Sequence, residues 1–232
     1  MTDASEVGPA YRELRERVIA LVQDLDETAL HAVAPATPEW RVRDLLAHLG
    51  GVTADITSGN MDGVATDAWT ARQVEARRDR PVAEILAEWE TQGAVVDELI
   101  GNFPPDASPQ LLTDAATHEH DIRGALEAPG ARDSAALAIG FEWTAARAGD
   151  GRPARLVTDA GTFTTGRALE SGTDDDAGDD VPTVRAGRFE LFRAFTGRRS
   201  LDQVLAFDWE GEPHPERVLA GIFSFRSAPL VE

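Results

Sequence analysis

The sequence predicts an α+β protein, in which a helical domain is followed by a smaller α+β domain. Two observations carry this prediction. In the first part of the chain, apolar residues recur every three to four positions, which is the pattern of amphipathic helices. Beyond the turn Gly149-Asp150-Gly151, the pattern changes to short β-branched and aromatic runs separated by turn residues. We therefore expect a helical bundle over residues 1–149 and an α+β domain over residues 150–232.

Five segments of the first domain carry apolar stripes at helical spacing. They are residues 9–29, 42–56, 82–99 and 109–127, and an Ala-rich segment that begins at Ser134. Pro81 stands at a position where a helix can begin. Pro129 and Gly130 follow the fourth segment and are typical of a helix end. The stripes of these helices predict a bundle with a buried apolar core.

The second domain begins with a predicted hairpin. Residues 155–158 and 162–165 read as two strands, and the turn Asp159-Ala160-Gly161 joins them. An acidic loop follows at residues 174–180. This loop lacks the ligand spacing of a calcium-binding EF-hand, so we interpret it as a solvated loop and not as a metal site.

Two further helices are predicted after the acidic loop. Apolar residues between Phe189 and Phe195 indicate one helix, which Gly197 closes. Ser200 is followed three positions later by Gln203, the spacing of a capping box, and this pair predicts the start of the next helix. The second domain therefore combines a hairpin with helices, which is the basis for its α+β assignment.

The charge of the chain argues against polyanionic partners. The formal net charge is −19 at pH 7, so nucleic-acid phosphates and anionic membrane surfaces would be repelled. No apolar run approaches the ~18 residues of a membrane-spanning helix, and the first residues lack the apolar stretch of a secretory signal. We expect a soluble cytoplasmic protein, a monomer or a homodimer, whose partners are small molecules.

The residue types that are missing restrict the chemistry. The chain contains no cysteine, so it has no thiolate metal ligand and no thiol nucleophile of its own. It also contains no lysine, which removes Schiff-base chemistry through a lysine amine. Any metal ion must be held by His, Asp or Glu side chains, and any thiol must come from a cofactor.

One carboxylate and one histidine share the apolar face of a predicted helix. At about 100° per residue, Asp114 lies about 40° from His118 on a helical wheel. Apolar Leu111 and Ile122 flank them, whereas Glu119 and His120 fall on other sides of the same helix. A buried carboxylate and a buried histidine are costly unless both are satisfied, and a metal ion would satisfy both.

His48 is a third candidate ligand, because it lies beside Leu45 and Leu49 on the inward side of another predicted helix. Two histidines and one carboxylate from facing helices form a common type of metal site in bundles. Three protein ligands leave one position open, as in catalytic zinc sites. The pattern is also compatible with a hydrogen-bonded core histidine and a simple intrahelical Asp114–His118 pair. The chain has no HExxH motif.

The segments that contain these residues resemble a known family. The stretch Pro38–Leu49, PEWRVRDLLAHL, and the stretch Asp114–Arg123, DAATHEHDIR, are similar to two motifs of the mycothiol-dependent maleylpyruvate isomerase-like proteins. These proteins belong to the DinB-like superfamily of metal-binding bundles. Further similar segments are Trp69–Val74, Glu88-Trp89-Glu90, Gly197–Ser200 and Asp208-Trp209, so the resemblance covers almost the whole chain. It implies an up-down four-helix bundle for the first domain.

The resemblance also assigns roles to individual residues. His48 and His118 match the two metal histidines of the family, and Asp121 matches an acid outside the metal shell that is implicated in catalysis. Asp114 stands where the family usually has Glu, which is one methylene longer. Arg41 replaces the Thr or Ser that often caps the following helix in the family. The family enzyme further uses an arginine of the C-terminal domain, for which the candidates are Arg226, Arg198 and Arg199.

The activity that the resemblance implies depends on a metal, with zinc as the expected ion, and on mycothiol. The cation stabilises the thiolate of this low-molecular-weight thiol. The thiolate would add to the double bond of a cis-unsaturated oxoacid, and rotation and elimination would give the trans isomer. Transfer of the thiol to a small electrophile is equally compatible with these residues. Two alternatives remain: a non-catalytic protein that binds a metal or small ligand, and a metal-dependent hydrolase.

Overall fold

The computed structural model describes residues 4–150, 152–166, 181–221 and 223–232. The chain divides into two compact units, Ala4–Gly130 and 131–232. The expected division lay between residues 149 and 150, so the structural division comes one helix earlier. Its reason is packing, because the helix that follows Ser134 contacts a helix of the C-terminal unit. The predicted acidic loop at 174–180 lies outside the described residues.

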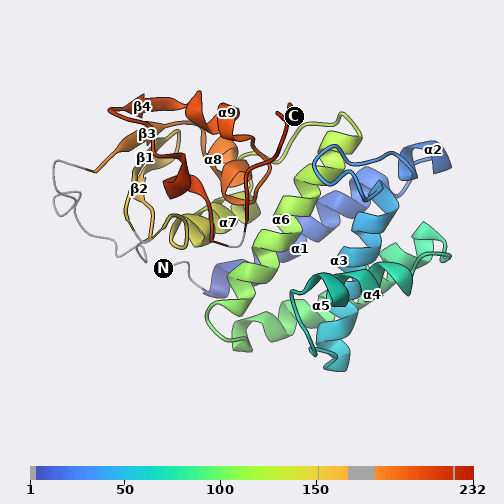
Figure 1. Ribbon diagram of the computed structural model, residues 1–232. Helices are drawn as coiled ribbons and strands as arrows, with labels where there is room; N and C mark the ends of the chain where they lie inside the picture. Colours follow the sequence, from blue (N-terminus) through green and yellow to red (C-terminus); the bar gives the residue numbers. More distant parts are fainter. Residues whose placement is uncertain (1–3, 151, 167–180, 222) are drawn as a thin grey trace. The chain divides into compact units, whose positions relative to one another are not determined.

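The long helices α1, α3, α5 and α6 form most of the first unit (Figure 1). Helices α1 and α3 each contact both α5 and α6, so the four close into a bundle and confirm the predicted architecture. Two short helices and one 3-10 turn complete the unit. The elements are α1 (Ala4–Val22), α2 (Glu27–Leu30), α3 (Val42–Ser58), α4 (Asp67–Glu75), α5 (Val82–Leu99), η1 (Ile100–Asn102) and α6 (Ala107–Ala125).

The predicted helix over residues 9–29 is two helices in the structure, and this prediction was wrong in extent. Helix α1 ends at Val22, and α2 begins only after Asp26. The Asp26 side chain accepts a hydrogen bond from the backbone N–H of Ala29 at 2.9 Å. An aspartate that caps a new helix in this way holds its own backbone in an extended conformation, which interrupts the preceding helix.

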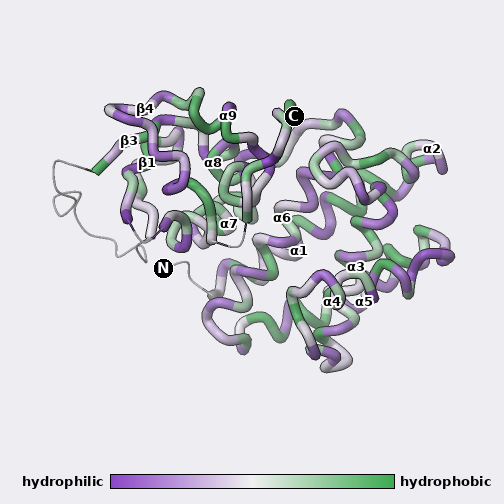
Figure 2. The backbone as a smooth tube through the Cα atoms, viewed as in Figure 1, coloured by the Kyte–Doolittle hydropathy of each residue, from purple (hydrophilic) through white to green (hydrophobic). Residues whose placement is uncertain are grey.

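The core of the bundle consists of the apolar stripes that the sequence predicts. Its fully buried members include Tyr11, Leu14, Val18, Leu45, Leu46, Ile85, Trp89, Val96 and Leu112. The indole N–H of Trp89 donates to the hydroxyl of Tyr11 at 3.2 Å, so the one polar atom of the largest core side chain is satisfied. No helix among the described residues is long and apolar enough to cross a membrane. Figure 2 shows hydrophilic residues interrupting each long helix.

The second unit is a small sheet with helices. Its elements are α7 (Ala135–Ala145), β1 (Arg155–Thr158), β2 (Gly161–Thr164), β3 (Thr183–Arg185), α8 (Arg188–Phe195), α9 (Leu201–Leu205), β4 (Asp208–Glu210) and η3 (Pro215–Val218). The strand order is β2-β1-β3-β4. The central pair β1–β3 is parallel, whereas β1–β2 and β3–β4 are antiparallel. The sheet and the helix contact α7–α8 confirm the α+β class of this part of the chain.

Two local predictions for this unit are confirmed. Strands β1 and β2 form the expected hairpin, in which Thr158 pairs with Gly161 across the turn. Ser200 and Gln203 form the expected capping box. The Ser200 hydroxyl accepts from the Gln203 backbone at 3.2 Å, and the Gln203 amide oxygen accepts from the Ser200 backbone at 3.0 Å. Both features depend on residues close in sequence, which is why the sequence alone predicts them.

Candidate metal centre

Three of the residues singled out in the sequence converge between two helices of the bundle. His48 comes from α3, and Asp114 and His118 come from α6. The Nε2 atom of His48 lies 3.2 Å from Oδ2 of Asp114, and the Nε2 atom of His118 lies 3.6 Å from Oδ1 of the same carboxylate. One ligand atom from each residue lies within 4.8 Å of the others. The two histidines therefore direct the same ring nitrogen toward a shared carboxylate.

The three residues differ in their access to solvent. His48 is 3% exposed and His118 is 8% exposed, whereas the side chain of Asp114 is 40% exposed. The ring of Trp40 packs against both imidazoles, with centroid distances of 5.4 Å to His48 and 5.6 Å to His118. The group is therefore enclosed around its two histidines and is most exposed at the Asp114 side chain.

The other ring nitrogen of each histidine meets a hydrogen-bond partner outside the group. Nδ1 of His48 lies 2.8 Å from Oε1 of Gln73, and Nδ1 of His118 lies 3.0 Å from Oδ2 of the fully buried Asp121. An oxygen acceptor at Nδ1 favours the tautomer in which Nδ1 carries the proton. The Nε2 lone pair then faces the group, which is the usual arrangement of metal-binding histidines.

The electrostatics at His48 indicate a position prepared for positive charge. Burial by itself would lower the pKa of this imidazole. The negative charge of Asp114 and the hydrogen bonds with Asp114 and Gln73 outweigh burial and raise the pKa of His48 above its ordinary value of 6.5. Without a metal, a proton supplies the positive charge that the carboxylate stabilises. A divalent cation in the same place would compete with that proton.

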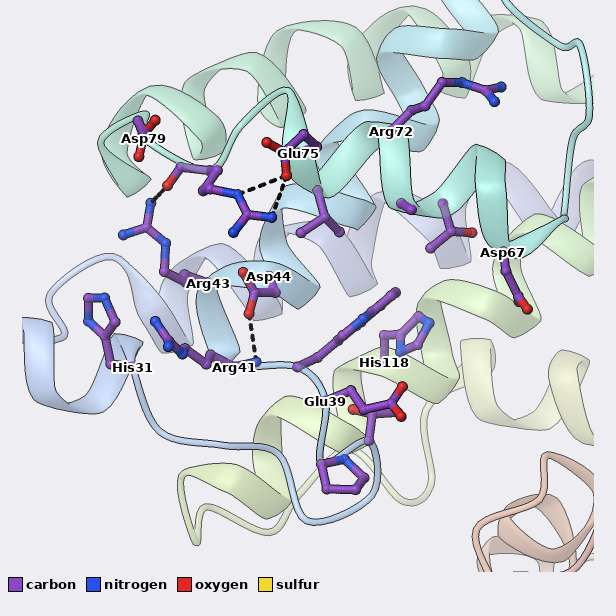
Figure 3. Close-up of a pocket in the computed structure, with 17 residues that line it drawn as sticks. His31, Glu39, Arg41, Arg43, Asp44, Asp67, Arg72, Glu75, Asp79 and His118 are labelled. Atoms are coloured by element: carbon purple, nitrogen blue, oxygen red, sulfur yellow. Dashed lines mark hydrogen bonds and ion pairs between the residues drawn. The ribbon is translucent and has the colours of Figure 1, made fainter.

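A large cleft in the bundle reaches the group at His118. Its volume is about 1180 Å³. The cleft lies between the segment that leads into α3 and one side of α4, and Figure 3 shows Arg41, Arg43 and Asp67 around it. It is lined by His31, Thr37, Pro38, Glu39, Trp40, Arg41, Arg43, Asp44, Asp67, Thr70, Ala71, Arg72, Val74, Glu75, Arg78, Asp79 and His118. Its charged residues carry both signs, so it suits a polar ligand.

Internal hydrogen bonds hold the wall of this cleft. Arg43 donates to the backbone oxygens of Arg78 at 2.6 Å and Arg80 at 3.1 Å, and Arg78 forms an ion pair with Glu75. At the start of α3, the backbone N–H of Arg41 donates to the Asp44 carboxylate at 2.9 Å. Asp44 thus satisfies a backbone donor at the start of α3, although position 41 lacks the Ser or Thr that often caps this helix in the family.

Glu119 and His120 are not members of the group, although both are buried. Glu119 is paired instead with Arg17 at 2.8 Å and with Arg123 at 3.0 Å. The helical wheel had separated these two residues from Asp114 and His118. Burial of α6 on several sides explains why they are nevertheless enclosed.

The candidate arginines belong to the C-terminal unit. Arg199 is 2% exposed and forms ion pairs with Glu190 at 2.7 Å and with Glu232 at 2.9 Å, so its role there is structural. Arg198 donates to the backbone oxygen of Thr196 at 2.6 Å. Arg226 continues the chain beside Arg199, where its backbone N–H donates to the Arg199 carbonyl at 3.1 Å. A catalytic role for Arg226 stays a prediction.

Sequence reasoning missed two residues that touch the group. Trp40 lies in the segment that resembles the family, but its packing on two histidines was not foreseen. Gln73 is 3% exposed and lies on α4, a helix that the periodicity did not predict. The available signal was Thr66, which caps α4 through the backbone N–H of Trp69. That signal predicts a helix, but it does not indicate which of its residues reaches His48.

The bundle and its two-histidine, one-carboxylate group match the class of helical bundles that build a metal site from side chains of facing helices. Comparison with known families is more specific. Residues 11–126 match the family described as mycothiol maleylpyruvate isomerase N-terminal domain. The match covers half of the chain and contains all three candidate ligands, so the chain belongs to this family. No curated protein and no solved structure matched the chain.

Proposed function

We propose that this protein is a metal-dependent enzyme that uses mycothiol, either to isomerise a cis-unsaturated oxoacid or to transfer the thiol to a small electrophile. The observation that carries the proposal is the convergence of His48, His118 and Asp114 beside a cleft, in a chain that belongs to the mycothiol-linked family. The chain has no cysteine, so the reacting thiol has to be supplied from outside.

The residues fit a divalent cation by the chemistry of their donors. Two imidazole Nε2 atoms and two oxygens of one carboxylate face one another, and both imidazole Nδ1 atoms have acceptors of their own. Nitrogen and oxygen donors of this number suit zinc in a site that keeps a position open. A bound cation would supply a lowered pKa for the incoming thiol, so that it reacts as a thiolate at neutral pH.

The chain's own residues then have separate tasks. Trp40 packs against both imidazoles and also lines the cleft, while the partly exposed Asp114 side chain keeps the group in contact with solvent. Asp121 is fully buried behind His118, so it orients the imidazole and cannot touch a substrate itself. We therefore assign Asp121 as a positioning residue. Of the catalytic role that the family resemblance implies, we keep only the orientation of His118.

The size of the cleft is compatible with a small-molecule ligand. Pockets for one small ligand usually measure roughly 300–1,000 Å³, and this cleft is about 1180 Å³. It is therefore large enough for a low-molecular-weight thiol. For the substrate carboxylate we propose Arg226, on the family resemblance alone. Replacement of Arg226 by Gln is expected to raise KM for a carboxylate substrate more than it lowers kcat.

The first test is the metal content of protein purified without chelators. We expect about one zinc per chain in the wild type, and its loss in His48→Ala and His118→Ala, because each variant removes one of three ligands. A His31→Ala variant serves as control, since His31 lines the far part of the cleft and is not in the ligand group. A wild-type chain that takes up no metal after reconstitution would contradict the proposal.

The second test separates the thiol enzyme from its alternatives. The zinc-loaded protein is mixed with unsaturated oxoacids or electrophiles, with and without mycothiol. Conversion that requires the thiol supports the proposal. Conversion that proceeds equally without thiol would indicate a hydrolase. A protein that binds zinc but neither binds mycothiol nor converts a substrate would be a non-catalytic binder.

A further inference from the structure

Gln73 links His48 to a second carboxylate that takes no part in the metal group. Its amide oxygen lies 2.8 Å from Nδ1 of His48, and its amide nitrogen donates to Oδ2 of Asp55 at 2.7 Å. Gln73 comes from α4, while His48 and Asp55 lie on α3. The amide is 3% exposed, so water does not replace these partners. The three side chains form a continuous hydrogen-bonded series.

The chemistry of Asp55 determines which way the amide of Gln73 points. An ionised carboxylate can only accept hydrogen bonds, so the NH₂ group of Gln73 has to face Asp55. The amide oxygen then has to face His48, and it can only accept. Nδ1 of His48 must therefore donate. While the imidazole is protonated, Nε2 also donates to Asp114, and once that proton leaves, Nε2 keeps the lone pair that faces the group. Asp55 thus selects the neutral tautomer of His48 through Gln73, without contacting the imidazole itself.

A glycine makes this arrangement possible. Gly51 lies three residues after His48 on α3, one turn further along nearly the same face. A Cβ atom at position 51 would lie 2.5 Å from Cβ and 2.8 Å from Cγ of Gln73. Real side chains do not approach that closely, so any larger residue would push Gln73 away from α3. The approach of α4 to the histidine therefore depends on the missing side chain.

We propose that Gln73, oriented by Asp55 and admitted by Gly51, is a positioning residue that sets the tautomer of His48 and thereby the affinity of the group for a divalent cation. The part that concerns affinity rests on the proposed function. The part that concerns the tautomer does not, because it follows from the hydrogen bonds that Gln73 makes with His48 and Asp55.

The first experiment measures zinc affinity of the full chain by competition with a chromophoric chelator. Gln73→Leu keeps a similar volume but removes the acceptor, and we expect zinc to bind about 10- to 100-fold more weakly. Gln92→Leu is the matched control. Gln92 is a partly buried glutamine of the same bundle, and its amide oxygen accepts from Thr57 at 2.6 Å. Unchanged affinity in Gln73→Leu, or an equal loss in both variants, would overturn the proposal.

A second variant tests the same role without deleting a polar group. Gly51→Ala does not change the identity of His48, Gln73 or Asp55. It adds a methyl group that pushes the Gln73 side chain away from α3. We expect it to weaken zinc binding in the same range as Gln73→Leu, and the double variant to be little worse than either single one. Circular dichroism establishes that the helices are retained. Additive losses in the double variant would show that the two residues act separately, against the proposal.

The third experiment needs no metal and tests the tautomer of His48 separately from the metal-dependent function. Imidazole ¹⁵N NMR of metal-free Asp114→Ala, at a pH where His48 is neutral, reports which ring nitrogen carries the proton without competition from Asp114. We expect the proton on Nδ1, and on Nε2 once Gln73→Leu is added. A proton on Nε2 in Asp114→Ala would overturn the inference, whatever the zinc result. Absence of zinc binding with the expected tautomer would contradict only the metal-dependent function.

Discussion

Asp114 and His48 lie 66 positions apart in the chain, yet Oδ2 of the aspartate is 3.2 Å from Nε2 of the histidine. The second oxygen of the same carboxylate faces His118. One aspartate therefore connects the two histidines, although aspartate is one methylene shorter than the glutamate that the family resemblance led us to expect. The short side chain spans the gap because α3 and α6 pack directly against each other.

Asp114 is expected to be indispensable for metal binding. Asp114→Asn keeps the shape of the side chain but removes its negative charge, which is the attraction for a divalent cation. We expect zinc affinity to fall by at least about 100-fold, more than for loss of a residue outside the ligand group. Asp62→Asn, an exposed aspartate of the same unit, is the matched control. Equal zinc affinity for wild type and Asp114→Asn would remove Asp114 from the ligands.

Zinc is expected to stabilise the protein more strongly as the pH rises. The folded-state pKa of His48 is raised, so its proton stabilises the metal-free fold below about pH 6.5, and this stabilisation is lost as the pH rises through the folded-state pKa. Zinc binds only the neutral imidazole, so its binding becomes stronger as the pH rises and the proton leaves His48. Tm measured with and without zinc should therefore diverge as the pH increases above 6.5.

The histidine variants supply the controls for this pH dependence. His31→Gln should keep the same pH profile, because His31 is not among the ligands. His48→Ala should lose the zinc-dependent shift in Tm at every pH. A zinc-dependent shift in Tm of the same size at low and high pH in the wild type would argue against proton–metal competition at His48.

Tyr11 is expected to resist deprotonation while the protein is folded. It is the only tyrosine in the chain and is fully buried, and burial raises its pKa well above the ordinary value of 10.0. Because the folded state holds this proton more tightly, stability is lost as the pH rises above the unfolded pKa. Phenolate absorbance should be absent at pH 10.0 in buffer and appear on addition of guanidinium. Phenolate absorbance in the folded protein at that pH would contradict the buried position.

Glu232 is expected to stabilise the C-terminal unit. Its carboxylate pairs with Arg193 at 2.5 Å and Arg199 at 2.9 Å, and both guanidinium groups are almost completely buried. Removal of this carboxylate takes one ion-pair partner from each of two buried cations, and of the two Arg199 keeps its pair with Glu190. We expect Glu232→Ala to lower the free energy of unfolding by about 3–5 kcal/mol, measured by urea unfolding.

An exposed ion pair of the same unit provides the comparison for Glu232. Glu210 pairs with Arg185 at 2.8 Å, but both side chains are largely exposed to solvent. Glu210→Ala should therefore cost less than about 1 kcal/mol. If the two variants lose the same stability, burial of the Glu232 pair does not have the effect that we assign to it.

The sequence by itself determined the features that depend on near neighbours in the chain. Apolar spacing predicted the long helices, because helical period alone decides which residues share a face. The β1–β2 hairpin and the Ser200–Gln203 capping box were predicted for the same reason. Helical position also indicated that Asp114 and His118 share one face, and that His48 points inward from another helix. These are the three residues that the structure brings together.

Only the tertiary structure decided the features that depend on how elements approach each other. It interrupted the first predicted helix at Asp26 and grouped α7 with the C-terminal unit. It also placed Gln73 against His48. The apolar periodicity does not mark Gln73, because its contact is created where α4 approaches α3 at Gly51, 22 positions away in sequence. Periodicity records which way a side chain points from its own helix, whereas a hydrogen bond between helices depends on the distance between their backbones.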